Sequence, residues 1–301
     1  MPAERTTSPD VDPSGTARSS PQTAGRGRVP TWSYFAGSAV FHYLGPSFAV
    51  LLFARVSAPG VAGLRIWTAA AVFALWRRPW RVLARLDGPG RRLVLAWGLV
   101  LAAMNTAFYL AIARLPLGTV AAIEFLPVVA LAALGARTGR HLAALVAAVG
   151  GVAMLTEVRL AGSPAGFVFA FANAALFTGY IVLAHRASRR LPDGVAALAA
   201  AMLAAAVLVV PLGAWQAAHA FADPVALAAG VGVGISSSVI PYVCDQLAMA
   251  RMARSTYALL VSLLPTTATV VGVVVLRQIP SPTEALGVAL VVAGVALQGS
   301  G

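Results

Sequence analysis

Long apolar stretches follow one another from Trp32 to Leu297, separated by short segments that contain Arg, Pro and Gly. A helix needs roughly 20 apolar residues to cross a hydrocarbon core about 30 Å thick. Because unpaired backbone groups are costly in lipid, stretches of this length predict membrane-spanning helices rather than open strands. We place ten spans, at residues 32–54, 60–77, 93–113, 117–136, 141–158, 164–185, 194–215, 225–249, 255–276 and 282–299.

The bulk composition supports an all-α membrane protein that crosses the bilayer many times. The chain is 59% hydrophobic and 11% charged, and its mean hydropathy is +0.82. A soluble domain of this size needs more charge to cover its surface. Residues 1–30 differ, because they are rich in Pro, Ser, Thr, Gly and Arg and offer little to bury, so we expect a disordered tail. They do not resemble a cleavable signal peptide, since the first span is too long.

The arginines predict the orientation of the spans. All 22 basic residues are Arg, and 17 of them fall on the side of the N-terminus if the ten spans are correct. The other side carries four (Arg55, Arg114, Arg159 and Arg277), and Arg65 lies within a span. The positive-inside rule therefore predicts a multi-pass protein of the cell (inner) membrane with both termini in the cytoplasm. The net charge of +12 needs no nucleic-acid partner.

The two halves of the chain resemble each other at several points. Similar segments recur in the same order: Ala-Ile-Ala-Arg at 111–114 and Ala-Met-Ala-Arg at 248–251, Thr119 and Thr256, Leu126-Pro127 and Leu264-Pro265. We expect two units, residues 31–160 and 161–301, each with five helices. An odd number makes the two units antiparallel, as in the inverted repeats of secondary transporters. Similarity by membrane composition alone is the alternative.

Ionisable residues within spans are rare, costly and functional candidates. Glu124 lies near the middle of its span, where it could exchange protons or hold a substrate ammonium group; a structural partner role is the alternative. Arg65 could bind a carboxylate through its forked guanidinium, or extend to the membrane surface. Asp245 could line the cytoplasmic end of the pathway or stabilise the end of its helix.

Other polar residues and four prolines complete the set of candidates. Asn105 and Tyr109 share one helix face, as do Asn173 and Tyr180, and each pair could line a cavity or bond a neighbouring helix. His42 could titrate near neutral pH or simply pack. Proline removes a backbone hydrogen bond and bends a helix, which could serve alternating access. The four prolines inside the spans are Pro46, Pro127, Pro241 and Pro265.

Several function classes lack their usual sequence features. The single Cys244 excludes an internal disulfide and a multi-cysteine metal site, and the four histidines are scattered, so we expect no metal and no cofactor. No Walker-type loop indicates an ATP-driven pump. A channel would show a re-entrant filter or rings of like charge. An intramembrane enzyme is a weaker alternative, because Ser236, Ser237 and Ser238 have no histidine near them in sequence.

Several short motifs follow one another in a fixed order along the chain. They are Ala58-Pro59-Gly60-Val61, Leu64-Arg65, Arg78-Pro79-Trp80-Arg81, Met104-Asn105, Phe108-Tyr109-Leu110, Leu115-Pro116-Leu117-Gly118, Glu124-Phe125, Pro241-Tyr242, Asp245 and Ala248-Met249. In order and spacing they resemble the EamA branch of the drug/metabolite transporter superfamily, and its threonine/homoserine exporter subgroup in particular, over about residues 33–298. The chain departs from the family at Phe41-His42-Tyr43, at Leu264 before Pro265, and at Leu276-Arg277-Gln278.

The resemblance implies ten helices in two inverted five-helix repeats, around a cavity lined by helices 1, 3, 4, 6, 8 and 9. It implies a non-enzymatic exporter of small metabolites such as amino acids, driven by proton antiport. A multidrug or other metabolite permease of the same fold is the alternative. The expected partners are the small-molecule substrate, protons and the lipid bilayer, and the chain is expected to be a monomer or a dimer.

Overall fold

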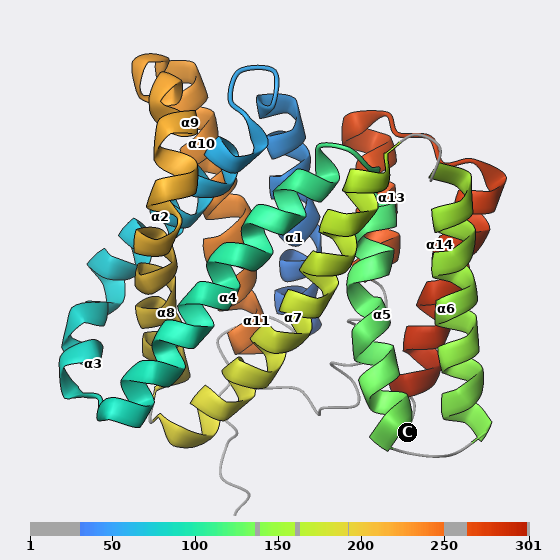
Figure 1. Cartoon of the computed structure of the whole chain (residues 1–301), viewed down its shortest axis with the longest axis horizontal. Coiled ribbons are helices and arrows are strands. Elements are labelled where there is room, and N and C mark those ends of the chain that lie inside the picture. The colour runs from blue at the N-terminus through green and yellow to red at the C-terminus, as the bar shows by residue number, and fades with distance from the viewer. Residues whose placement is uncertain (1–30, 136–138, 160–162, 192, 250–263, 300–301) are drawn as a thin grey trace, which may run out of the picture. The chain divides into compact units, whose positions relative to one another are not determined.

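The computed structural model describes residues 31–135, 139–159, 163–191, 193–249 and 264–299, and all regular elements in these ranges are helical (Figure 1). The tail 1–30 and the link 250–263 lie outside the described residues. The helices are α1 (Thr31–Leu52), α2 (Ala58–Arg77), α3 (Pro79–Arg85), α4 (Gly88–Ile112), α5 (Leu117–Gly135), α6 (Gly139–Arg159), α7 (Pro164–Arg190), α8 (Gly194–Leu208), α9 (Val210–Ala222), α10 (Pro224–Gly234), the π-helical turn η1 (Ile235–Val239), α11 (Ile240–Met249), α13 (Leu264–Leu276) and α14 (Pro282–Gly299).

The lengths of the helices fit a membrane protein. Among the described residues, four helical stretches are long and apolar enough to cross a bilayer: 58–77, 88–112, 164–187 and 224–244. A fifth exists if α8 and α9 form one broken span. Five shorter apolar helices are also present, at 36–52, 117–127, 139–155, 264–276 and 282–297.

Acidic side chains begin several of these helices. Asp87, Asp193 and Asp223 each accept hydrogen bonds from backbone N–H groups in the first turn of α4, α8 and α10. Ser281 and Glu284 form a reciprocal capping box at the start of α14, with bonds of 2.8 and 3.2 Å. These four caps account for every described acidic side chain except Glu124.

Prolines mark the irregular points of the helices. Pro46 and Pro127 lie inside α1 and α5. Pro241 and Pro265 are the second residues of α11 and α13, and α11 begins directly after η1. The predicted span 194–215 is wrong in shape, because α8 and α9 meet at 77° and helix continues to Ala222. The break precedes Pro211, which has no N–H for the carbonyl of Val207.

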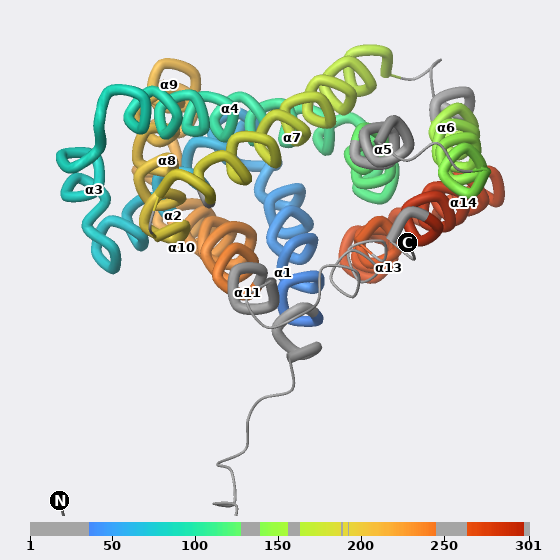
Figure 2. Tube along the Cα trace, turned by 90° about the horizontal axis from the view of Figure 1, so that it is seen from below, coloured from blue at the N-terminus to red at the C-terminus, as the bar shows by residue number. Residues whose placement is uncertain are grey.

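Two apolar clusters hold the helices together. The larger one joins α1, α2, α4, α5, α6, α7, α9, α10, α13 and α14 around large buried side chains such as Tyr43, Ile123 and Leu155. The smaller one packs α8 against α2 and α4 around Phe73, Leu101 and Met202. Both views place α6 along α14 and α4 along α7, while α1 lies beside α10, η1 and α11 (Figure 1 and Figure 2).

Candidate functional site

Five polar side chains from five helices form one buried group, which we call the Glu124 cluster. Its members are Tyr43 on α1, Arg65 on α2, Tyr109 on α4, Glu124 on α5 and Asn173 on α7. Only 6% of Glu124 and 6% of Arg65 is exposed. The alternative that Arg65 extends to the surface is therefore wrong: its side chain lies between helices.

Glu124 is the acidic member of the cluster. Its carboxylate interacts electrostatically with Arg65 and Tyr43. Asn173 lies beside the carboxylate, but the Nδ2 and Oδ1 atoms of its amide are both buried without a hydrogen-bond partner. The Oε2 atom of Glu124 is also buried without a hydrogen-bond partner. The carboxylate thus lies near the positive charge of Arg65, and its Oε2 atom remains able to bind a ligand or a proton.

Arg65 connects α2 to the π-helical turn. Its Nε donates to Oγ of Ser238 at 2.7 Å, and its Nη2 donates to the backbone carbonyl of Ser237 at 2.8 Å. Its guanidinium carbon lies 5.5 Å from the centre of the Tyr109 ring, a cation–π distance. The charge of Arg65 also acts on His42, which is half-buried on α1.

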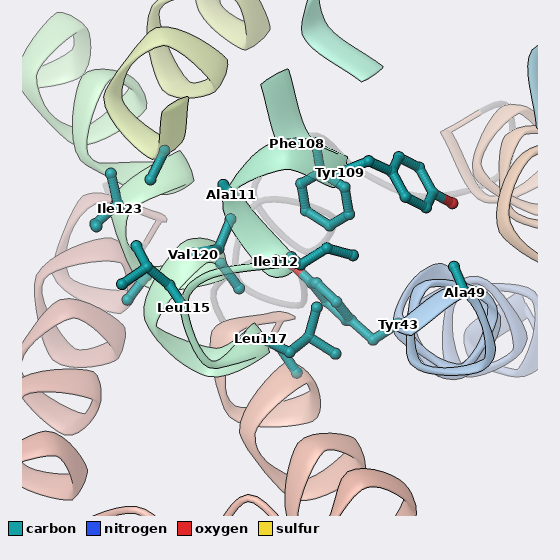
Figure 3. Close-up of a cluster of buried hydrophobic side chains, with 14 of the residues drawn as sticks. Tyr43, Ala49, Phe108, Tyr109, Ala111, Ile112, Leu115, Leu117, Val120 and Ile123 are labelled. Carbon is teal, nitrogen blue, oxygen red and sulfur yellow. The ribbon is translucent and has the colours of Figure 1, made fainter. Parts of the chain in front are cut away.

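Two buried tyrosine hydroxyls in the cluster have no hydrogen-bond partner, those of Tyr43 and Tyr109. Figure 3 shows the Tyr43 ring pointing from α1 towards Ile112 and Leu117, while the hydroxyl of Tyr109 points the other way. Buried polar atoms are nearly always paired in folded proteins, so each exception needs an explanation. Together with Oε2 of Glu124 and the amide of Asn173, these hydroxyls are buried polar groups that lack a hydrogen-bond partner.

The remaining sequence candidates behave differently. Asn105 is buried, but its Nδ2 donates to the carbonyl of Leu101 one turn earlier on α4. Tyr180 is half-buried, and its ring stacks on Phe177 at 6.2 Å. The side chain of Asp245 lies outside the described residues.

Sequence reasoning missed two parts of the site. In the sequence Tyr43 stands out only as a departure from the family pattern, although its central position in an apolar span predicts that its hydroxyl is buried. The sequence suggests Ser237 and Ser238 only as possible nucleophiles, whereas both bind Arg65 in the structure. The spacing of four between Ser237 and Pro241 was the available signal, because it marks a helix carbonyl without its usual donor.

A separate cavity of about 340 Å³ lies between the turn that joins α4 to α5 and the turn that joins α13 to α14. Its polar lining includes Arg114, Thr119, Thr269 and Gln278. Gln278 accepts a hydrogen bond from the backbone N–H of Leu117 at 3.1 Å, so this side chain ties the two turns together. No member of the Glu124 cluster lines this cavity.

Comparison with known proteins places the chain among transporters. Residues 164–299 match the model of the EamA-like transporter family. The chain is 32% identical over 252 residues to the threonine/homoserine exporter RhtA of Escherichia coli (strain K12), covering 83% of this chain and 84% of that protein. The threonine/homoserine exporter RhtA of Salmonella typhimurium (strain LT2) is 32% identical over 256 residues, with the same coverage. A protein of known crystal structure matches 89% of this chain and 95% of its own, with a TM-score of 0.56; at 21% identity it supports the fold alone.

Proposed function

The chain belongs to the EamA-like transporter family, and from this premise we propose that it exports threonine, homoserine or similar small amino acids by proton antiport. The relatives supply the substrate class, since both are named as threonine/homoserine exporters. The single observation that carries the mechanism is Glu124, a buried carboxylate whose Oε2 has no hydrogen-bond partner.

In this proposal the carboxylate of Glu124 holds either the ammonium group of the substrate or a proton, but not both. That exclusion couples the two movements, because a protonated carboxylate has no charge to attract an ammonium group. The amide of Asn173 and the hydroxyls of Tyr43 and Tyr109 offer hydrogen bonds to the remaining polar atoms of the substrate. These groups approach from four different helices, so substrate binding favours one arrangement of the helices over another.

The proposed architecture is ten spans in two inverted five-helix repeats, 31–160 and 161–301, with both termini in the cytoplasm. The four long apolar stretches, the bent pair α8–α9 and the five shorter apolar helices support this number. Reporter fusions at Ala218 and Gly301 test the orientation. They should report opposite sides of the membrane, and the same side for both would overturn the topology.

Efflux from cells that express the chain tests the function. Cells loaded with threonine or homoserine should lose it faster when they carry the parent protein, and a protonophore should abolish the difference. Glu124→Gln keeps the shape of the side chain but cannot ionise, so efflux should fall by about tenfold or more while membrane insertion stays normal.

Asp193→Asn is the matched control. It also removes one carboxylate, but Asp193 caps α8, and Asn caps a helix about as well as Asp. Its efflux should stay close to that of the parent. Efflux by Glu124→Gln at the parent rate would refute the role of Glu124, and no expression-dependent efflux of either amino acid would refute the substrate class.

A further inference from the structure

The π-helical turn η1 lacks one backbone donor that a regular helix would have. In an α-helix the carbonyl of Ser237 accepts a hydrogen bond from the N–H of residue 241. Residue 241 is Pro, which has no N–H, so this bond cannot form. Within η1 the backbone bonds span five residues instead, as from the N–H of Ile240 to the carbonyl of Ile235. A buried carbonyl that loses its α-helical donor is stabilised by another donor within reach, such as a side chain.

Arg65 is the group that satisfies it. The Nη2 atom donates to the Ser237 carbonyl at 2.8 Å, and Nε of the same planar guanidinium donates to Ser238 Oγ at 2.7 Å. Arg65 and Ser237 are 172 residues apart in sequence, and Ser237 is fully buried. The two bonds therefore use the forked geometry of arginine on a single helical turn.

The backbones around η1 are packed closely enough to hold this geometry. A Cβ atom on Gly234 would lie 2.5 Å from Cβ of Thr68 and 3.0 Å from the carbonyl oxygen of Arg65 itself. On the other side, a Cβ atom on Gly45 would overlap Ser237. The turn is thus packed closely between α1 and α2, which both belong to the first half of the chain.

We propose that Arg65 is a positioning residue: it replaces the backbone donor missing at Pro241 and so fixes the π-helical turn of the second half against α2 of the first half. Two of its three guanidinium nitrogens bind η1, so the role assigned here is to hold the geometry of the helices around the site. Its consequence for transport rests on the proposed function, because η1 borders the Glu124 cluster through Arg65.

The test restores the missing backbone N–H by substituting Pro241. In Pro241→Ala the backbone regains an N–H four residues after Ser237, so Arg65 is no longer needed there. Arg65→Gln in the parent should lower threonine efflux about tenfold, the size expected for loss of a charge-assisted hydrogen bond. In the Pro241→Ala background the same change should alter efflux by no more than about threefold.

A second readout does not depend on transport. Cys244, the single cysteine of the chain, is half-buried on α11 three residues after Pro241, and its Sγ lies 4.0 Å from a Cβ built on Gly37 of α1. The rate at which N-ethylmaleimide labels Cys244 in purified protein therefore reports how α11 packs on α1. Arg65→Gln should raise that rate about tenfold, and adding Pro241→Ala should return it to within about threefold of Pro241→Ala alone.

Arg65→Lys keeps the charge but not the fork, so both readouts should fall between the parent and Arg65→Gln. If Arg65→Gln is equally damaging with Ala at 241, or leaves Cys244 labelling unchanged, the positioning role is refuted. If Arg65→Gln alone does not fold, recovery of folded protein in the double variant supports the proposal, and its absence overturns it. A parent that exports no amino acid refutes the proposed function, while the labelling comparison still decides the role of Arg65.

Discussion

The contact between α6 and α14 and the contact between α2 and η1 both join the two halves of the chain, and both are close, but they differ in the groups that meet. Between α6 and α14 the backbones meet directly: a Cβ on Gly151 would lie 2.5 Å from the carbonyl oxygen of Gly287, and one on Gly294 would lie 2.6 Å from that of Ala144. Between α2 and η1 the contact also includes two hydrogen bonds from one arginine side chain.

The difference lies in the polar groups, since both contacts are packed closely. Close backbone packing through glycine and alanine gives many dispersion contacts between α6 and α14. The contact between α2 and η1 lies beside the unpaired polar atoms of the Glu124 cluster, which can form bonds to a substrate or a proton. We therefore assign α6 and α14 to the scaffold, and the Glu124 cluster to the part that changes during transport.

Breaking the scaffold should have the largest effect. Gly151→Leu forces a side chain into the backbone of α14, so we expect a loss of more than about 3 kcal/mol and little folded protein. The control is Gly150→Ala at the neighbouring residue. Its added Cβ would have no neighbouring atom within 4 Å, so this variant should melt like the parent. Thermal melting in detergent and the yield of monodisperse protein measure both. Parent-like stability of Gly151→Leu would contradict the scaffold assignment.

A smaller change at η1 should damage transport more than folding. Gly234→Ala places a methyl group against Thr68 and the Arg65 carbonyl, and overpacking of this kind costs about 1–3 kcal/mol. Gly232→Ala, two residues earlier, faces open space and serves as the control. Melting temperature and efflux should both fall for Gly234→Ala alone. Equal behaviour of the two variants would show that the close packing at η1 has no role.

Removing a hydroxyl from the cluster should affect binding with little cost to the fold. The hydroxyl of Tyr43 is buried and unpaired, so Tyr43→Phe should change the free energy of unfolding by less than about 1 kcal/mol. If the hydroxyl binds the substrate, the KM for efflux should rise about fivefold or more. Ser47→Ala is the control, because its hydroxyl bonds the carbonyl of Tyr43 within α1. An unchanged KM in Tyr43→Phe would remove Tyr43 from the site.

The weakest expected effect lies at a helix end, where Arg55 and Asp223 form an exposed ion pair at 2.8 Å. The backbone N–H of Ala226 and the Arg55 guanidinium favour the ionised carboxylate and lower the pKa of Asp223 below its ordinary value. The resulting stability is present above about pH 4 and is lost as the pH falls through the lowered value.

Asp223→Asn should therefore melt slightly below the parent at neutral pH, and this difference should shrink at acid pH and in high salt. Exposed ion pairs contribute little, so the difference is expected to be small. A difference in melting temperature that grows on acidification would contradict the assigned direction of the pKa.

The sequence by itself was enough to identify the class of protein. Long apolar stretches and scarce charge are sufficient to predict an all-helical membrane protein, and the ordered motifs predicted the transporter family that the relatives confirm. Ten spans, inverted repeats and cytoplasmic termini remain predictions from the arginine distribution and the repeated motifs. Glu124 was recognisable because a carboxyl group in the middle of an apolar span is costly wherever it points.

Only the tertiary structure decided what the polar residues face. These helices are apolar on nearly every side, so periodicity does not indicate which face of α2 points inward. Arg65 lies in the interior, where it donates to the carbonyl of Ser237, 172 residues away in sequence. The unpaired hydroxyl of Tyr43 and the 77° break before Pro211 likewise follow from how distant helices pack, and local sequence carries only the prolines that permit them.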